Sequence, residues 1–295
     1  MTTTIATSPI VTTTEDGMQV RRARQNLLVF AGFLIPLSLF GYWFNIKYPD
    51  LNLNFSVMPM MFAPGLASII TRLVRREGFA DVSFRLHGNR MRSAYLLAFA
   101  LPLVVGMIAY GFAYLSGLAK LGPPSSFAIL GSPLAQVGVI FVLAATAGIL
   151  LGFPTSAGEE IGWRGYLLPR MIQARIPQPI LLTSLIWGAW HLPVVFAGVL
   201  LAGPSHWLSA ATVMVVVLPL GAILAWLRLE TGSIWPTIMV HTAWNAFMNA
   251  GFTFATQNPH QNIWIGENGI LVIVTLILAA LFLSRTWKPA SLMNA

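Results

Sequence analysis

Long apolar runs recur along the whole chain and restrict what it can fold into. Each run has close to 20 residues and almost no charge. At a helical rise of about 1.5 Å per residue, such a run can cross a hydrocarbon core of about 30 Å. The sequence therefore predicts an all-α protein, a polytopic transmembrane helical bundle of about eight spans: Leu27–Phe44, Phe55–Leu73, Ala94–Leu115, Leu134–Phe153, Ile180–Ala197, Trp207–Leu227, Ser233–Ala250 and Gly269–Ser284.

The composition supports this class, with 56% hydrophobic and 9% charged residues. A net charge of +8 could suggest nucleic acid as a partner, but the basic residues lie between apolar runs and form no patch interleaved with aromatic side chains. We therefore expect no nucleic-acid partner. Cysteine is absent, which excludes disulfides, thiolate metal ligands and a thiol nucleophile. Any chemistry must come from other side chains.

The basic residues predict the orientation in the membrane. If the N-terminus is cytosolic, nearly all arginines and lysines fall in cytosolic segments, and the other side holds only Lys47 and Lys120. This asymmetry follows the positive-inside rule. With eight spans, both termini are expected in the cytosol.

Two adjacent glutamates, Glu159 and Glu160, stand between apolar runs in a chain that has few acids. A charge at membrane depth costs roughly 2.5–3.5 kcal/mol on insertion scales and usually marks a functional site. Glu160 could simply pair with Arg164, four residues later on the same helix face. Glu159 points about 100° away around the helix and has no local partner. Pro154 should bend or interrupt the fourth span, after which this segment either prolongs the span or forms a separate helix.

Two histidines and an asparagine are expected at similar depth. His191 lies ~16 Å into its span and His241 ~12 Å into another, counted at helical rise from the cytosolic end. Asn245 shares a helix face with His241. Each of them alone could be an interhelical hydrogen bond. Together with Glu159 they form a candidate constellation.

Such a set suits hydrolysis of an amide bond by activated water. A carboxylate withdrawn from water becomes a stronger base, which suits Glu159 as general base. An imidazole can position the same water or bind a metal ion, and a second imidazole with a carboxamide can donate hydrogen bonds to an oxyanion. These roles suit His191, and then His241 with Asn245. Glu159, His191 and His241 would also make an open zinc site, so a divalent metal remains an open expectation for the cofactor.

These residues resemble the motifs of the CPBP family, which includes CAAX prenyl proteases and bacteriocin-processing membrane proteases and is also called the ABI family. Its Glu-Glu-x-x-x-Arg motif is intact as Glu159, Glu160 and Arg164. Its His-x-x-x-Asn motif is intact as His241 and Asn245. Three motifs in order on successive membrane segments make the resemblance specific, although each one is short.

The remaining motif, Phe-x-x-x-His, departs from the family pattern because Trp187 precedes His191. An aromatic ring is kept, so only the local packing is put in doubt. The resemblance implies an intramembrane endopeptidase whose cavity opens toward the cytosol. In that picture Glu159 activates water together with His191, whereas Glu160 and Arg164 orient the helix. The family is often described as metalloproteases, and a metal-free glutamate mechanism is also argued for one branch.

The resemblance also organises the chain. We expect a disordered cytosolic tail at 1–26, transmembrane helices at 27–125, a CPBP/CAAX protease-like catalytic core at 126–250, and a last transmembrane helix with a short tail at 251–295. The short loops resemble those of bacterial members, which implies the bacterial inner (plasma) membrane. The expected partners are membrane lipid and a membrane-associated protein or peptide, cut near the cytosolic face in peptide maturation, immunity or sorting. The oligomeric state is not indicated.

Two other classes of protein would use the same residues differently. A non-catalytic membrane immunity or peptide-binding protein would hold a peptide in the same cavity and would tolerate Glu159→Gln. A small transporter would need discontinuous helices or inverted repeats around the charged site. The only break of that kind is near Pro154, so the sequence favours the protease.

Overall fold

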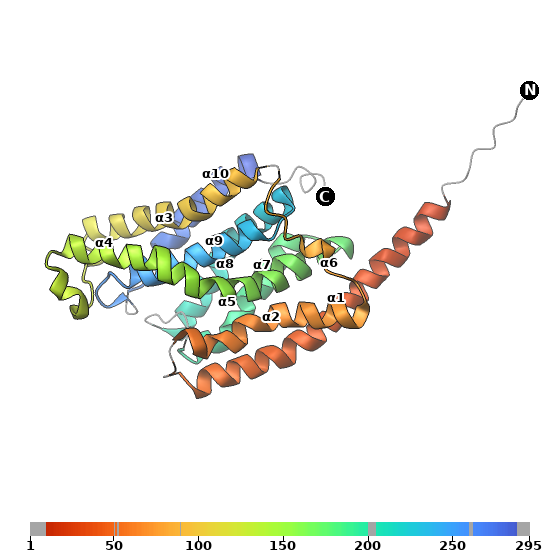
Figure 1. The fold of residues 1–295 in the computed structure, drawn as a ribbon, viewed down its shortest axis with the longest axis horizontal. Helices are drawn as coiled ribbons and strands as arrows, with labels where there is room; N and C mark the ends of the chain where they lie inside the picture. The colour runs from red at the N-terminus through yellow and green to blue at the C-terminus, as the bar shows by residue number, and fades with distance from the viewer. Residues whose placement is uncertain are drawn as a thin grey trace, which may run out of the picture.

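The computed structural model describes residues 10–49, 51, 53–88, 90–199, 205–259 and 262–287. These residues form a bundle of helices, and the described ranges contain no strand (Figure 1). The all-α polytopic bundle predicted from the sequence is confirmed. The α-helices are α1 Ile10–Lys47, α2 Leu53–Arg75, α3 Met91–Leu115, α4 Pro133–Leu143, α5 Ile149–Gly162, α6 Leu168–Gln173, α7 Pro179–Phe196, α8 His206–Thr231, α9 Trp235–Asn245 and α10 Ile270–Trp287.

Three π-helical turns interrupt these helices without ending them. They are η3 Ala144–Gly148 between α4 and α5, η4 Trp163–Leu167 between α5 and α6, and η5 Ala246–Thr253 after α9. Because η3 and η4 keep the chain helical, Pro133–Gln173 forms one long helical segment. Pro154 lies inside α5 and does not terminate it. The segment that carries the two glutamates therefore prolongs the fourth span.

In the described ranges, seven helices are long and apolar enough to cross a membrane. The predicted span 233–250 is not among them, although it is helical through α9 and η5. It carries the polar residues His241, Asn245 and Asn249, which reduce its mean hydropathy. A polar helix of this kind can lie inside a bundle, where other helices shield it from lipid.

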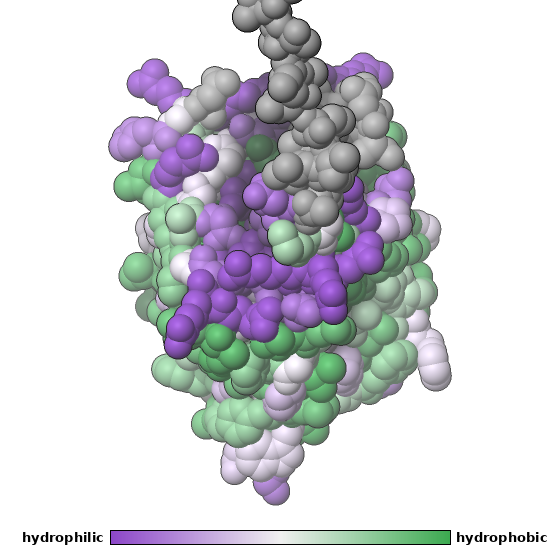
Figure 2. Space-filling model, turned by 90° about the vertical axis from the view of Figure 1, so that its right-hand side faces the viewer, coloured by the Kyte–Doolittle hydropathy of each residue, from purple (hydrophilic) through white to green (hydrophobic). Residues whose placement is uncertain are grey.

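One end of the bundle collects most of the arginines, and we call it the arginine end. Arg75 Nε donates to Asn26 Oδ1 at 2.7 Å, which joins the end of α2 to the early part of α1. The Arg90 guanidinium lies 4.5 Å from the Trp287 ring centre, which joins the start of α3 to the end of α10. Figure 2 views the molecule from this end and shows hydrophilic side chains gathered there above apolar flanks.

The opposite end, called the far end here, is defined by contacts of Tyr110 and Asn268. Tyr110 OH lies 2.7 Å from Thr253 Oγ1, and Asn268 Nδ2 donates to Thr212 Oγ1 at 2.8 Å. The end of α3, the end of η5 and the beginnings of α8 and α10 thus lie together. The α9–η5 segment runs from the arginine end to the far end, and α10 returns. Over the described residues, the chain therefore passes through the bundle eight times, and α1 starts at the end where α10 finishes.

The prediction of a disordered tail at 1–26 needs correction over residues 10–26, because α1 begins at Ile10; residues 1–9 lie outside the described residues. Threonine is a weak helix former, but extending an existing helix costs far less than nucleating one. Arg24 Nε also donates to the carbonyl of Ala174 at 3.2 Å, and Asp16 pairs with Arg175. These contacts attach the first turns to the α6–α7 connection.

Glycines let α2 approach α5 closely enough to fix the glutamate segment. A Cβ added to Gly65 would lie 2.5 Å from the carbonyl oxygen of Gly158, and one added to Gly162 would lie 2.3 Å from Pro64 Cβ. Only residues without side chains allow two helix backbones to come this near. Because these glycines flank Glu159 and Glu160, the close packing holds the glutamate helix in register against α2.

An ion-pair network links the loop after α2 to α6 at the arginine end. The Asp81 carboxylate accepts from Arg72 and, at 2.7 Å, from Arg170 Nη1. Glu77 accepts from Arg170 Nε at 3.0 Å and from Tyr166 OH at 2.8 Å. From the sequence these arginines indicated only orientation, because residue spacing does not reveal that their guanidinium groups turn inward.

This network makes stability depend on pH. Burial alone would raise the pKa of the Asp81 carboxyl, but the hydrogen bonds and charges of Arg72 and Arg170 outweigh burial and hold that pKa below its usual value. A lowered pKa gives stability that is present above the ordinary value of about 4 and is lost as pH falls through the lowered one. We expect Asp81→Asn to unfold a few degrees earlier than wild type at pH 7, and the gap to narrow at pH 3. Thermal unfolding in detergent measures both.

The control for this prediction is Asp16→Asn. Asp16 forms an exposed pair with Arg175, with half of its side chain accessible to solvent. Exposed pairs contribute little to stability. An equal loss at pH 7 in both variants, or a gap that stays constant with pH in Asp81→Asn, would contradict the assignment.

Candidate active site

Glu159 is a buried carboxylate in the C-terminal part of α5, held by two tryptophans. Its Oε2 accepts from Trp187 Nε1 at 2.8 Å and from Trp163 Nε1 at 3.2 Å. Its relative exposure is 1%. Both indole bonds reach the same oxygen, so neither of them uses Oε1. Hydrogen bonds of this kind fix the direction of the carboxylate and supply part of the donors that a buried carboxylate needs.

The neighbouring Glu160 has a different set of partners. Its Oε1 accepts from Arg164 Nη1 at 2.8 Å and from His241 Nδ1 at 2.9 Å. The side chains of Glu160 and Arg164 are 0% and 1% exposed. The salt bridge predicted from their spacing is therefore present and fully buried. It also extends across the bundle to α9, where it fixes the ring of His241.

The π-turn η4 starts directly after the glutamate helix and exposes backbone carbonyls that two arginines satisfy. Arg228 Nε donates to the carbonyl of Arg164 at 3.2 Å, and Arg72 Nη2 donates to that of Gly165 at 2.9 Å. A π-turn shifts carbonyls out of the regular helical pattern, and such turns are frequent at functional sites. The arginine end thus braces the helix that presents the glutamates.

His191 presents one ring nitrogen that its backbone contact leaves available. Its Nδ1 lies 2.9 Å from the carbonyl oxygen of Trp187, one turn earlier in α7. A carbonyl oxygen can only accept, so Nδ1 carries the proton in this arrangement. In the neutral ring Nε2 then keeps a lone pair, which can accept a hydrogen bond from water. This tautomer suits the water-positioning role predicted for His191.

Trp187 lies at the centre of the predicted residues, a role that its motif position did not reveal. Besides its bond to Glu159, its ring centroid lies 5.7 Å from that of His191 and 5.5 Å from that of His241. The Arg164 guanidinium lies 4.5 Å from the Trp187 ring centre. The departure from Phe at this position therefore adds a hydrogen-bond donor to the carboxylate. The motif predicted an aromatic ring four positions before His191, but it did not indicate the bond of that ring to Glu159.

A cavity of about 1170 Å³ brings the four predicted catalytic residues together. Its lining includes Glu159, His191, His241 and Asn245, which come from α5, α7 and α9. Glu160 and Arg164 are not among the lining residues. This arrangement separates the residues that can meet a substrate from the pair that orients them. Apolar side chains of α2, α4 and α8 form much of the remaining wall.

The direction of the cavity differs from the opening toward the cytosolic, arginine-rich side implied by the family resemblance. Beyond the predicted catalytic residues, its lining continues to loop residues of the far end, among them Gly122, Asn258, Asn262 and Asn268. On the other side of Glu159 the space is filled by Trp163 and the Arg164 pair, all buried. The packing of these buried side chains against Glu159 is the physical reason for the difference.

A zinc ion held by Glu159, His191 and His241 stays a prediction. Among the described residues, no three His, Cys, Asp or Glu side chains form a group that could hold a metal ion. Oε2 of Glu159 accepts from two indole N–H groups and Nδ1 of His241 bonds to Glu160, but these bonds use neither Oε1 of Glu159 nor Nε2 of His241. Zinc sites of catalytic type need three protein ligands around an open position.

Comparison with known proteins identifies the segment that carries these residues. Residues 133–247 match the family model described as type II CAAX prenyl endopeptidase Rce1-like. The match runs from the start of α4 to just beyond Asn245 and lies within the segment 126–250 expected to be the catalytic core. No curated protein matches the chain. The resemblance found in the motifs is confirmed: segment 133–247 of this multi-pass membrane protein is similar to the type II CAAX prenyl endopeptidases of the Rce1-like family, within the CPBP intramembrane proteases.

Proposed function

We propose that the protein is an intramembrane endopeptidase that hydrolyses a peptide bond with water activated by Glu159. The observation that carries the proposal is that Glu159, His191, His241 and Asn245 line one cavity, while the buried Glu160–Arg164 pair orients them from outside it. The family match supports peptide hydrolysis as the type of reaction.

In this mechanism a water lies between Glu159 Oε1 and His191 Nε2. Glu159 takes a proton from the water while the water oxygen attacks the carbonyl carbon of the substrate. This attack gives a tetrahedral intermediate that carries an oxyanion. The Asn245 amide donates to that oxyanion, together with His241 Nε2–H when the ring is protonated against Glu160. The carbon–nitrogen bond then breaks, and Glu159 returns the proton to the leaving amine. The products are a carboxylic acid and an amine.

The substrate that fits the cavity is a membrane-associated peptide with a hydrophobic segment. The wall between the catalytic residues and the far end carries apolar side chains such as Met60, Leu143 and Val216, whereas the rim carries several asparagines. An apolar wall with a polar rim suits a chain whose hydrophobic part lies in the bundle and whose polar part lies in water. We propose that the peptide enters from the far end or from the lipid. The bond is then cut at the level of Glu159, in the half nearer the arginine end.

The predicted location belongs to this proposal. A bacterial inner membrane with both chain ends in the cytosol agrees with the collection of arginines at the end where α1 starts and α10 finishes. Under that orientation the far end faces away from the cytosol. A peptide that reaches the cavity from there would be an exported or membrane-inserted one.

Hydrolysis can be tested with purified protein, hydrophobic transmembrane peptides and water enriched in oxygen-18. We expect wild type to give a product whose new carboxyl group carries one heavy oxygen, detected by mass spectrometry. His191→Ala should reduce the rate about 100-fold or more, within the range of positioned acid–base groups, without loss of folded protein. Peptide bound by the wild type without any product would favour the non-catalytic binding protein. An unchanged rate in His191→Ala would contradict the proposed positioning role.

A further inference from the structure

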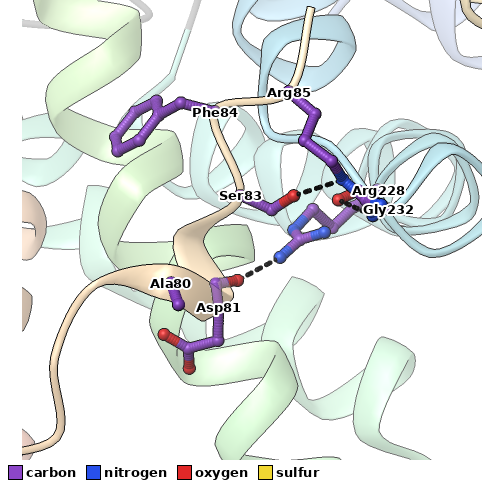
Figure 3. Close-up of a pocket in the computed structure, with 7 residues that line it drawn as sticks. All are labelled: Ala80, Asp81, Ser83, Phe84, Arg85, Arg228 and Gly232. Carbon is purple, nitrogen blue, oxygen red and sulfur yellow. Dashed lines mark hydrogen bonds between the residues drawn. The ribbon is translucent and has the colours of Figure 1, made fainter. Parts of the chain in front are cut away.

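A second pocket lies at the arginine end, outside the site described above. It has a volume of about 600 Å³ and is lined by Ala80, Asp81, Ser83, Phe84, Arg85, Arg228 and Gly232 (Figure 3). These residues come from the loop after α2 and from the end of α8. None of them lines the catalytic cavity.

Two guanidinium groups of this pocket are bonded only to neutral oxygens. Arg228 Nη2 donates to the carbonyl of Asp81 at 2.6 Å. Arg85 donates from Nε to Ser83 Oγ at 3.1 Å and from Nη2 to the carbonyl of Gly232 at 3.2 Å. Across the described residues, no carboxylate lies within ion-pair distance of either arginine. Neither positive charge is therefore directly paired with a carboxylate.

The acids nearby are already engaged by other arginines. Figure 3 shows the Asp81 side chain directed away from Arg228, while its backbone carbonyl faces Arg228. The Asp81 carboxylate pairs with Arg72 and Arg170, and Glu230 pairs with Arg90 at 2.9 Å. The pocket therefore keeps an excess positive charge, and Arg228 is buried with an exposed fraction of 7%. A buried cation without a counter-ion is costly, so an anion that fills the pocket would be stabilised.

The surroundings of the pocket point to the level of lipid headgroups. Phe84 is exposed, and its ring centroid lies 5.6 Å from that of Trp235 at the start of α9. Trp235 in turn stacks on Phe153 of α5, within a membrane-spanning segment. Tryptophan and other aromatic side chains collect where a membrane protein meets the headgroup region. The two arginines thus share the pocket with an aromatic side chain that lies beside the start of α9.

We propose that this pocket binds a phosphate group, supplied by the headgroup of an anionic lipid or by free phosphate. Guanidinium groups present paired N–H donors that match phosphate oxygens. Arg85 and Arg228 reach the pocket from two different segments, so a bound phosphate joins the loop after α2 to the end of α8. Arg228 also donates to the carbonyl of Arg164 in η4. The pocket is therefore connected through Arg228 to the turn that follows the glutamate helix.

The test is binding of short-chain phosphatidylglycerol, phosphatidylcholine and inorganic phosphate to the full chain in detergent, followed by its thermal unfolding. We expect phosphatidylglycerol to stabilise wild type more than phosphatidylcholine does. In Arg85→Gln the dissociation constant for phosphatidylglycerol should rise at least tenfold. Arg92→Gln removes an equal charge from the same end, outside the pocket, and should change it less than twofold.

A further variant removes no charge. A Cβ at Gly232 would lie 2.4 Å from Arg85 Nη2 and would displace it, so Gly232→Ala should also weaken binding. Arg228→Gln adds to the test if that variant folds. Stabilisation by inorganic phosphate at millimolar concentration, lost in Arg85→Gln, would assign the site to free phosphate. Equal binding of both lipids, or equal weakening in Arg92→Gln and Arg85→Gln, would overturn the proposal.

Discussion

Glu159→Gln is expected to abolish peptide hydrolysis while the protein stays folded. The amide oxygen of glutamine can still accept from Trp187 and Trp163, so the local packing is kept. What is lost is the group that takes a proton from water, and removal of a positioned base reduces rates by about 10²–10⁴. We expect a loss of at least about 1000-fold in kcat, with an unfolding temperature close to that of wild type. Product formation and thermal unfolding are measured on the same preparation.

The matched control for Glu159→Gln is Glu267→Gln. Glu267 lines the same cavity at the far end, where it accepts from Asn249 Nδ2 at 2.9 Å. It is remote from the histidines, so its removal should change the rate only a few-fold. If Glu159→Gln keeps substantial activity, or if both variants lose activity alike, Glu159 is not the base. Peptide binding that persists in an inactive Glu159→Gln would separate recognition from chemistry.

Much of the fold was predictable because apolar run length is a direct physical requirement of the membrane. The predicted span 233–250 is less apolar than the seven membrane-spanning helices of the described residues, because it carries His241 and Asn245. Its place inside the bundle depends on contacts such as that of His241 with Glu160. No local pattern encodes such a contact. The same limit explains the N-terminal helix over residues 10–26, whose attachment to Arg175 and Ala174 joins positions far apart in the sequence.

The residues of the candidate site were predictable from the sequence, but the contacts from other helices that hold them were not. Helical spacing separates Glu159 from Glu160 by about 100°, and the structure gives them different partners, as that geometry requires. Trp187 as a donor to Glu159 could not be derived, because the bond joins α5 to α7. The course of the cavity toward the far end could not be predicted from the sequence either, since it depends on how Trp163 and the Glu160–Arg164 pair pack beside Glu159.

The buried Glu160–Arg164 pair leads to the second large effect. Arg164→Met should leave the Glu160 carboxylate in a dry environment with only His241 as partner, and breaking a buried pair from one side costs about 3–5 kcal/mol. We expect a fall in the unfolding temperature of about 10 °C, together with loss of activity, because the His241 ring is held through Glu160.

The double variant Glu160→Gln with Arg164→Met tests this interpretation more sharply than either single change. With both charges removed, no unpaired ion remains, and neutral replacement of a buried pair is often tolerated. We therefore expect the double variant to be more stable than Arg164→Met, with a coupling energy above about 1 kcal/mol in a double-mutant cycle.

Arg90→Met is the control. Arg90 pairs with Glu230, and the two side chains are 34% and 22% accessible, so the loss of this pair should reduce the free energy of unfolding by about 1 kcal/mol or less. Additive losses in the cycle would show that Glu160 and Arg164 stabilise the bundle independently. Their pairing would then not be what orients His241 toward the cavity.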